Sequence, residues 1–259
     1  MSNNGWLASK PCKKYEPIPE KEGCCHNKFM RPEKEGCCCS KSMYKALELL
    51  FDPSIKDAVL DDRFAFIGKK FLVGTPLELV PPNGSLATIG NDNTGAPMAT
   101  LNSIDPCNHE YISITSSGYY YPTPYEAGSP ANPYFIPNPV SNVSLCNLDA
   151  IIFDYNPSGP IGANFISNLQ KLIDSKYTCH NFKNDECCCG NSVYKDIYTP
   201  YSFNGNLVNI NAGWLALYQA KVLGRVGDIL VLANSRSDRH RIYFVCLESV
   251  EFYGRETYI

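Results

Sequence analysis

The sequence lacks any apolar run long enough to cross a membrane. A transmembrane helix needs about 18 or more mostly apolar residues in succession, and no stretch of the 259 residues approaches that length. The first residues also lack the charged and apolar regions of a secretory signal. We therefore expect synthesis in a cytoplasm, without a signal peptide and without membrane binding.

Charge and catalytic motifs are scarce as well. Charged residues make up 19% of the chain and the net charge is -3, so the sequence offers no basic surface for nucleic acid. The motifs of serine hydrolases, phosphate-binding loops and zinc proteases are absent. The chain also has no Cys-x-x-Cys for thiol catalysis. These absences predict a protein that is not an enzyme, needs no cofactor and binds no nucleic acid.

Cysteine, by contrast, is abundant. The chain has 13 cysteines, and an odd number means that at least one thiol is free or bonded to another molecule. So many cysteines are unusual in a chain made in a reducing cytosol. Two explanations stay open: later exposure of the protein to an oxidant, or binding of metal by the thiols.

Six of the cysteines form two triplets with the same following text. Residues 37–45 and 187–195 both read Cys-Cys-Cys-x-x-Ser-apolar-Tyr-Lys. Adjacent Cα atoms lie about 3.8 Å apart, whereas a disulfide normally needs about 4.4–6.8 Å. Because neighbours in a triplet pair only under strain, each triplet reaches toward several partners, as a cross-linking node would.

The residues before the first triplet resemble an extended arm. A Pro-Glu-Lys-Glu-Gly-Cys-Cys unit begins at Pro19 and again at Pro32. Proline, glycine and charge without apolar periodicity are typical of extended or poorly ordered chain. We therefore predict a cysteine-rich N-terminal arm over residues 1–40 and a structural body over residues 41–259.

The first half of the body, residues 41–150, mixes helix and strand. Helical spacing of apolar residues predicts a helix over 42–50, and a second short helix follows over 55–60. Strands are expected at 64–67, 70–73, 77–80 and 110–115. The Pro- and Tyr-rich insertion at about 81–139 is otherwise predicted to be a long loop.

The second half, residues 151–259, follows a strand predicted at 148–155. An amphipathic helix is predicted over 163–176. Five strands then form a β-meander at 207–211, 214–223, 228–233, 241–247 and 249–253, with turns at 224–227 and 234–239. The predicted fold class is α+β, predominantly antiparallel β as a small barrel or sandwich, with a few short helices.

Metal binding is the main alternative to cross-linking. Thiolates bind zinc well, and histidines adjoin Cys25 and Cys179. However, no pair of Cys-x(2–4)-Cys units occurs at zinc-finger spacing. The sequence therefore assigns no metal site, and a zinc-binding or storage module stays the alternative function.

Three segments resemble the clostridial cysteine-rich spore coat proteins of the CotA type, which are unrelated to the copper oxidase of that name. They are residues 37–50, residues 144–154 (Ser-Leu-Cys-Asn-Leu-Asp-Ala-Ile-Ile-Phe-Asp), and a block from the second triplet to residue 250. The resemblance implies a structural protein of the spore coat or exosporium, made in the mother cell and assembled around the forespore. Related cysteine-rich proteins form exosporium lattices, so a sheet or fibre of many copies is expected, together with contacts to other spore-surface proteins.

On this interpretation the cysteines fall into two groups. Three isolated cysteines are expected to be buried structural residues: Cys107, Cys146 and Cys246. The others are expected to form disulfides between subunits: Cys12, Cys24, Cys25, Cys37, Cys38, Cys39, Cys179, Cys187, Cys188 and Cys189.

Overall fold

The structure is a computed structural model that describes ten stretches of the chain. They are residues 38–69, 71–74, 99–105, 108–121, 134–177, 193–194, 197, 207–213, 215–234 and 240–255.

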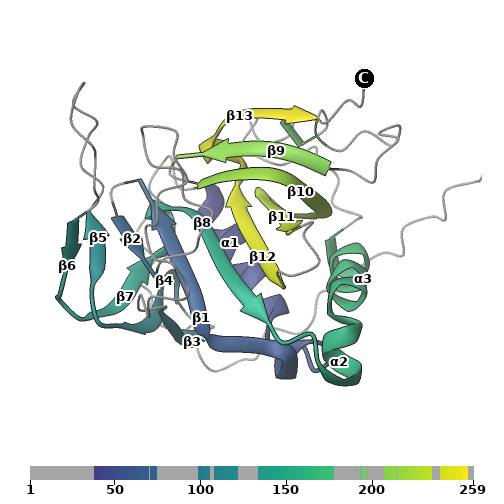
Figure 1. Cartoon of the computed structure of the whole chain (residues 1–259), viewed down its shortest axis with the longest axis horizontal. Helices are drawn as coiled ribbons and strands as arrows, with labels where there is room; N and C mark the ends of the chain where they lie inside the picture. Colours follow the sequence, from purple (N-terminus) through teal and green to yellow (C-terminus); the bar gives the residue numbers. More distant parts are fainter. Residues whose placement is uncertain are drawn as a thin grey trace, which may run out of the picture.

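Antiparallel strands dominate these residues, with a few short helices between them (Figure 1). The helices are α1 (Cys38–Leu49), η1 (Lys56–Ala58), α2 (Gly159–Ala163), η3 (Leu145–Asn147), α3 (Phe165–Tyr177) and η4 (Leu247–Ser249). The strands of the first half are β1 (Val59–Gly68), β2 (Phe71–Val73), β3 (Thr100–Asp105), β4 (Asn108–Ser116), β5 (Tyr119–Tyr121), β6 (Tyr134–Ile136), β7 (Val140–Ser144) and β8 (Leu148–Tyr155). Those of the second half are β9 (Leu207–Ala212), β10 (Leu215–Val226), β11 (Ile229–Ala233), β12 (Arg241–Cys246) and β13 (Val250–Arg255).

Among the described residues, ten strands join in one curled sheet. Their order is β13-β9-β10-β11-β12-β8-β1-β2-β5-β6, and every pairing is antiparallel. A smaller sheet has the order β3-β4-β7. The predicted fold class is therefore confirmed, but the five C-terminal strands continue into the first half instead of closing by themselves.

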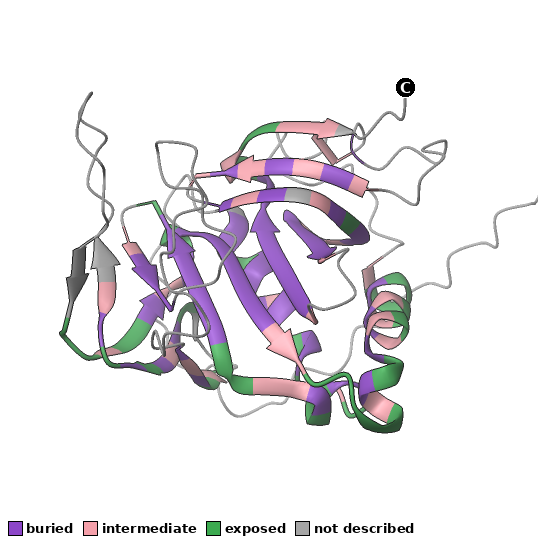
Figure 2. Ribbon diagram, viewed as in Figure 1, coloured by how far each residue is buried: buried purple, intermediate pink, exposed green. Residues whose placement is uncertain are grey.

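Both faces of the central strands of the large sheet are buried (Figure 2). Strand β8 carries six successive buried residues, and β12 is buried throughout. Such apolar runs are typical of strands covered on both faces. One core contains Phe64, Phe153 and Phe244 with α1 and α3, and the other contains Ile152, Leu215 and Tyr243.

The chain contains the same strand plan twice. We call residues 38–155 unit 1 and residues 193–255 unit 2. In unit 1 the hairpin β1–β2 pairs Gly68 with Phe71 and Phe66 with Val73. In unit 2 the hairpin β9–β10 pairs residues 212 with 215 and 210 with 217, again across a two-residue turn. Each first strand also pairs with the last strand of its own unit, β1 with β8 and β9 with β13.

The irregularities of the ladders repeat as well. The β1–β8 register shifts at Asp149, and the β9–β13 register shifts at Glu251. Likewise, the β3–β4 register skips Asn102 and the β10–β11 register skips Leu223. Because β-bulges are specific features of a strand pair, two bulges at matching positions mark a duplication.

A one-turn 3-10 helix precedes the final strand of each unit. Helix η3 leads into β8 and η4 leads into β13, and both are flanked by residues in extended conformation. In each case the backbone N–H after the turn donates to the carbonyl of its first leucine, Leu145 or Leu247. Leu145 and Leu247 are therefore equivalent, and they lie 102 residues apart. The same offset relates the other residues of β7, η3 and β8 to those of β12, η4 and β13.

The repeated cysteine text, at 37–45 and 187–195, overlaps the start of each unit. The first triplet runs into α1, whose Met43 and Leu47 are fully buried. The corresponding residues of the second copy, Val193 and Ile197, are helical and pack on the other core. The local sequence repeat is thus the visible part of a longer structural repeat.

Three local predictions are corrected by the structure. Helix α1 begins at Cys38, inside the predicted arm, and residues 55–60 form the 3-10 turn η1 and the start of β1 instead of a second helix. The predicted turn at 224–227 belongs to β10 up to Val226. Gly224 follows the bulge residue Leu223 and has a φ of +152°, and a side chain there would press on Ile173 of α3.

The Pro- and Tyr-rich insertion contains more strand than predicted, namely β3, β5 and β6 besides β4. The strand predicted at 77–80 lies outside the described residues, as does most of the turn predicted at 234–239. None of the described helices has the length and apolar character needed to span a membrane.

Candidate functional site

The most distinctive chemical feature of the structure is a disulfide between the two units. Cys39 lies in the first turn of α1 in unit 1, and Cys246 is the last residue of β12 in unit 2. Their Cα atoms are 5.8 Å apart and 207 positions apart in sequence. Both residues are buried, so the bond lies within the protein.

Hydrogen bonds hold the start of α1 in the same place. The Ser42 hydroxyl accepts a hydrogen bond from the Asp228 N–H (3.1 Å) and donates to the Asp228 carboxylate (3.3 Å). Asp228 follows Gly227, whose φ of +57° and lack of a Cβ allow the β10–β11 turn to approach Ser42 closely. The helix of unit 1 is therefore fixed to unit 2 both by a covalent bond and by a local polar contact.

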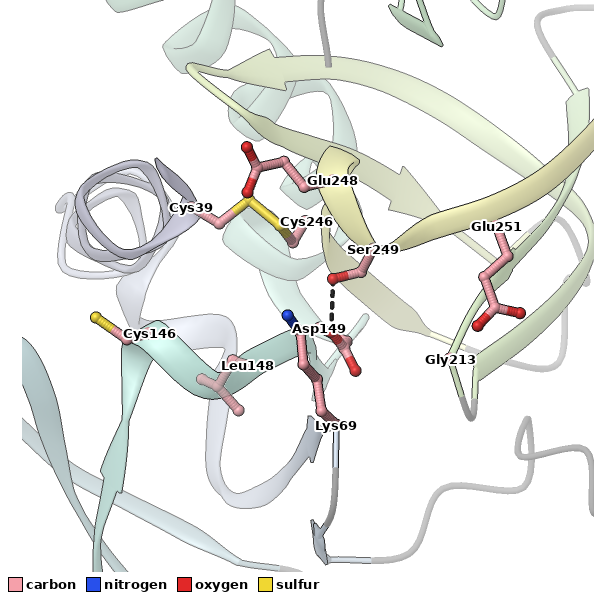
Figure 3. A pocket seen from close by; sticks show the side chains of 10 residues that line it. All are labelled: Cys39, Lys69, Cys146, Leu148, Asp149, Gly213, Cys246, Glu248, Ser249 and Glu251. Atoms are coloured by element: carbon pink, nitrogen blue, oxygen red, sulfur yellow. Dashed lines mark hydrogen bonds between the residues drawn. A yellow bond between two sulfur atoms is a disulfide. The ribbon is translucent and has the colours of Figure 1, made fainter. Parts of the chain in front are cut away.

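A cavity of about 450 Å³ opens beside the disulfide (Figure 3). Residues from both units line it, namely Cys39, Lys69, Cys146, Leu148, Asp149, Gly213, Cys246, Glu248, Ser249 and Glu251. The two 3-10 turns and the two bulge residues, Asp149 and Glu251, meet here. The cavity therefore marks the junction of the repeats.

Asp149 is the buried polar group of this junction. The Ser249 hydroxyl of unit 2 donates to its carboxylate at 2.5 Å. A side chain at Gly213, in the β9–β10 turn of unit 2, would come within 3.0 Å of the other carboxylate oxygen. Burial raises the pKa of Asp149, and the Ser249 hydrogen bond and nearby Lys69 only partly oppose this, while the charge of Glu251 adds slightly to the rise.

A second cross-unit contact lies in the sheet. Strands β8 and β12 pair from Ala150–Val245 to Asp154–Arg241. The Arg241 guanidinium, 3% exposed, donates two hydrogen bonds to the Asp154 carboxylate at 2.5 and 2.9 Å. We call the β8–β12 pairing, with this ion pair and the disulfide, the internal seam.

The junction is a poor metal site while the disulfide is formed. The ligand atoms of Cys39, Cys246 and Glu248 lie within 4.8 Å of one another. Structural zinc, however, is usually held by four ligands and requires cysteine as thiolate. Reduction would have to release both sulfurs before these residues could bind zinc. The described lining residues also include no histidine to act as a general base beside a thiol.

Two of the predicted cysteine roles need correction. Cys39 was predicted to form bonds between subunits, but its sulfur is bonded to Cys246 of the same chain. Cys146 was predicted to be a buried structural residue, but it is exposed in η3 and disulfide-bonded, to a partner whose side chain lies outside the description. Cys246 is buried but is not an isolated thiol.

The remaining predicted cysteines stay predictions. Cys38 lies in α1, but its side chain is not described. The others lie outside the described residues: Cys12, Cys24, Cys25, Cys37, Cys107, Cys179, Cys187, Cys188 and Cys189.

Sequence reasoning missed the pairing of Cys39 with Cys246. A signal was available in the repeated turn, because Leu145-Cys-Asn-Leu-Asp and Leu247-Glu-Ser-Val-Glu share the order apolar, any, polar, apolar, acidic. Aligning these segments would have placed Cys246 beside an inter-unit junction.

Fold and site together define a cysteine-rich β protein built from two copies of one unit and tied internally by a disulfide. The chain belongs to the spore coat protein CotA-like family, whose model matches residues 37–254. It is 30% identical over 285 aligned positions to the spore coat protein CotA of Clostridioides difficile (strain 630), covering 92% of this chain and 86% of that relative. No solved structure matches the chain. The predicted resemblance is therefore confirmed.

Proposed function

We propose that this protein is a structural building block of the spore surface that assembles with copies of itself and is then cross-linked by disulfides. Family membership supports a structural role in the spore coat. The finer statement, a lattice or fibre of many copies hardened through cysteine, rests on the chemistry of the thiols.

The observation that carries this proposal is the oxidised state of the described cysteines whose side chains are placed. Cys39, Cys146 and Cys246 are all disulfide-bonded. These bonds occupy four of the 13 cysteines, counting the partner of Cys146, and nine remain. Nine cannot pair completely within one chain, so at least one is free or bonds to a neighbour.

Electrophoresis of assembled material with and without reductant tests this function. We expect ladders, or protein too large to enter the gel, that collapse to monomer only with reductant. Replacing Cys187, Cys188 and Cys189 together by serine should remove most of the ladder. The matched control, Cys39→Ser with Cys246→Ser, should keep the ladder because this bond lies within one chain.

A monomer in both lanes, in material taken from intact spore surfaces, would contradict the proposal. The second candidate, a zinc-binding module, is favoured by the proximity of Cys39, Cys246 and Glu248. It predicts stoichiometric zinc in freshly reduced protein, with loss of that zinc in the Cys39→Ser and Cys246→Ser variant. Protein that is monomeric and contains zinc would replace the first function with the second.

A further inference from the structure

The duplication leaves one strand edge of each unit without its counterpart contact. At the internal seam the last strand of unit 1, β8, pairs with β12, the strand before η4 in unit 2. The strand of unit 2 that corresponds to β8 is β13, and the strand of unit 1 that corresponds to β12 is β7. Among the described residues, β13 pairs only with β9 and β7 pairs only with β4, so each has a free outer edge.

These two free edges lie in different parts of the molecule, β13 at the top of Figure 1 and β7 at the lower left. Within the described chain they do not pair with each other. Two copies placed head to tail can bring β13 of one against β7 of the next. Such a contact joins different surfaces of the two copies and can therefore repeat.

We propose that β13 of one copy pairs antiparallel with β7 of the next, repeating between chains the pairing that β8 and β12 make within one. The proposal rests on the self-assembly proposed above and names its surface. The internal register, Ala150 opposite Val245 and Ile151 opposite Phe244, transfers by the 102-residue correspondence. It places Phe252 opposite Val143, and Tyr253 opposite Asn142.

The exposure of Phe252 is the first observation that supports this surface. This side chain is 64% exposed, the highest value among the large exposed apolar residues that the structure describes. Its counterpart in unit 1, Ala150, is completely buried against unit 2. The same position is thus covered in one unit and uncovered in the other.

An apolar groove beside β7 is the second observation. It has a volume of about 220 Å³ and is lined by Phe71, Val73, Tyr119, Val140, Asn142, Val143 and Ser144. In unit 2 the residues that correspond to Phe71, Val73 and Val143 are Leu215, Leu217 and Val245. These three pack in the same core as Ala150 of β8. The groove is therefore the place that a strand occupies in unit 2 and that stays open in unit 1.

The outer contact lacks the two strongest features of the internal seam. Ser144 stands where unit 2 has Cys246, and Pro139 stands where unit 2 has Arg241. The outer contact therefore has neither the counterpart of the Cys39–Cys246 bond nor that of the Arg241–Asp154 ion pair. It should form reversibly before any cross-linking, which lets misplaced copies dissociate.

The test is the size of the full-length protein in solution with reductant present, measured by sedimentation velocity against concentration. Reduced wild type should form assemblies that grow with concentration. Phe252→Asp alters the β13 side and Val140→Asp alters the β7 side. Each should raise the dissociation constant of the contact by about a hundredfold. The matched control is Phe51→Asp, another exposed aromatic, and it should assemble like wild type.

Mixing the two altered proteins tests the head-to-tail geometry. Phe252→Asp keeps an intact β7 edge and Val140→Asp keeps an intact β13 edge, so an equimolar mixture should stop at a dimer with one copy of each. Unfolding curves of both variants verify that they are folded.

Three results would overturn the proposal. They are reduced wild type that stays monomeric at every concentration, assemblies indifferent to both aspartate variants, and a mixture that forms no dimer. In the first case the disulfide-linked ladder of oxidised wild type still decides the cross-linking function separately. A protein that assembles neither with nor without oxidation would contradict both.

Discussion

Units 1 and 2 share one backbone plan but are covered differently. In both, the first strand pairs with the last, a bulge sits after the 3-10 turn, and a second bulge interrupts the middle ladder. In unit 1 the outer face of β1 carries Ala65 and Ile67, both fully buried against unit 2. The matching positions of β9 are Asn209 and Asn211, which are half-buried.

The two units keep the same strand arrangement, but the polarity of their side chains differs according to whether another part of the protein covers that face. Along β1, the face of unit 1 that meets unit 2 is apolar, as expected for a permanent contact. The face of unit 2 that corresponds to it mixes amides with the exposed Phe252. Such a mixture is typical of a surface that is exposed for part of the protein's lifetime.

Breaking the covalent tie between the units should have the largest effect. Cys39→Ser removes a cross-link that spans 207 positions, and we expect the free energy of unfolding to fall by about 4 kcal/mol. Chemical denaturation of oxidised protein measures this loss. In strong reductant the variant and wild type should unfold alike, and a difference that persists there would assign the loss to packing.

Exchanging equivalent residues between the units should reveal the asymmetry of their faces. Ile67→Asn buries an amide that has no hydrogen-bond partner, and it should lower the free energy of unfolding by about 3–5 kcal/mol. The reverse change in unit 2, Asn211→Ile, should change monomer stability by less than about 1 kcal/mol and strengthen assembly. Denaturation of dilute protein and sedimentation of concentrated protein measure the two effects. Equal costs at both positions would mean that the faces are equivalent after all.

The two matching bulges in the middle ladders offer a smaller contrast. Leu223 is 1% exposed and packs with the core that contains α3, so Leu223→Ala should cost about 2–4 kcal/mol. Asn102 is exposed, with its amide on the Thr115 hydroxyl, so Asn102→Ala should cost about 0.5 kcal/mol. Parallel urea titrations of the two variants provide the comparison. A large cost at Asn102 would show that this bulge is fixed by its side chain.

The bulge residues beside the 3-10 turns should differ in pH dependence. Burial raises the pKa of Asp149 above its ordinary value of 3.8, so folding favours the protonated acid. The stabilisation by Asp149 is therefore complete below that value and is lost as the pH rises through the raised pKa. Asp149→Asn should remove this loss, so that wild type weakens relative to the variant as the pH rises above 3.8.

The matched control is Glu251→Gln, at the exposed equivalent position of β13. Because the charge of Glu251 is the smallest of the causes that raise the pKa of Asp149, this variant should reduce the pH dependence of monomer unfolding only slightly, and less than Asp149→Asn does. Unfolding curves at several pH values, recorded on reduced and dilute protein, measure both variants. Parallel curves for Asp149→Asn and wild type would mean that Ser249 compensates the burial fully.

Strands with buried faces could be predicted from the sequence, whereas edge strands could not. The apolar run of β8 predicted its bounds, and the runs of β11 and β12 nearly did. Strand β7 has Ser141 and Asn142 between its valines and is paired on one side only, so its apolar signal is weak. Gly224 was interpreted as a turn because glycine marks turns and bulges alike, and only the packing of α3 distinguishes them.

The duplication was visible only where its side chains are conserved between copies. The repeated cysteine text could be recognised in the sequence. Elsewhere, equivalent positions hold different residue types: the pair Phe64–Phe153 of unit 1 corresponds to the pair Val208–Arg255 of unit 2. The Cys39–Cys246 bond depends on where α1 lies relative to β12, which no spacing in the sequence encodes. Paired bulges, which are properties of the backbone, were needed to recognise the second copy.

The position of the Cys39–Cys246 bond also determines how the body would carry mechanical load. A pull on the chain before residue 39 passes through the two sulfurs into β12. Strand β12 pairs antiparallel with β11 on one side and β8 on the other. The force would therefore be resisted by the hydrogen bonds of both strand pairs together, and α1 would not be pulled away from the sheet. The 207-residue span between the sulfurs is bypassed. If copies in a surface layer were attached to one another through their N-terminal segments, tension would pass from the sheet of one copy to the sheet of the next, and the helices would carry little of it.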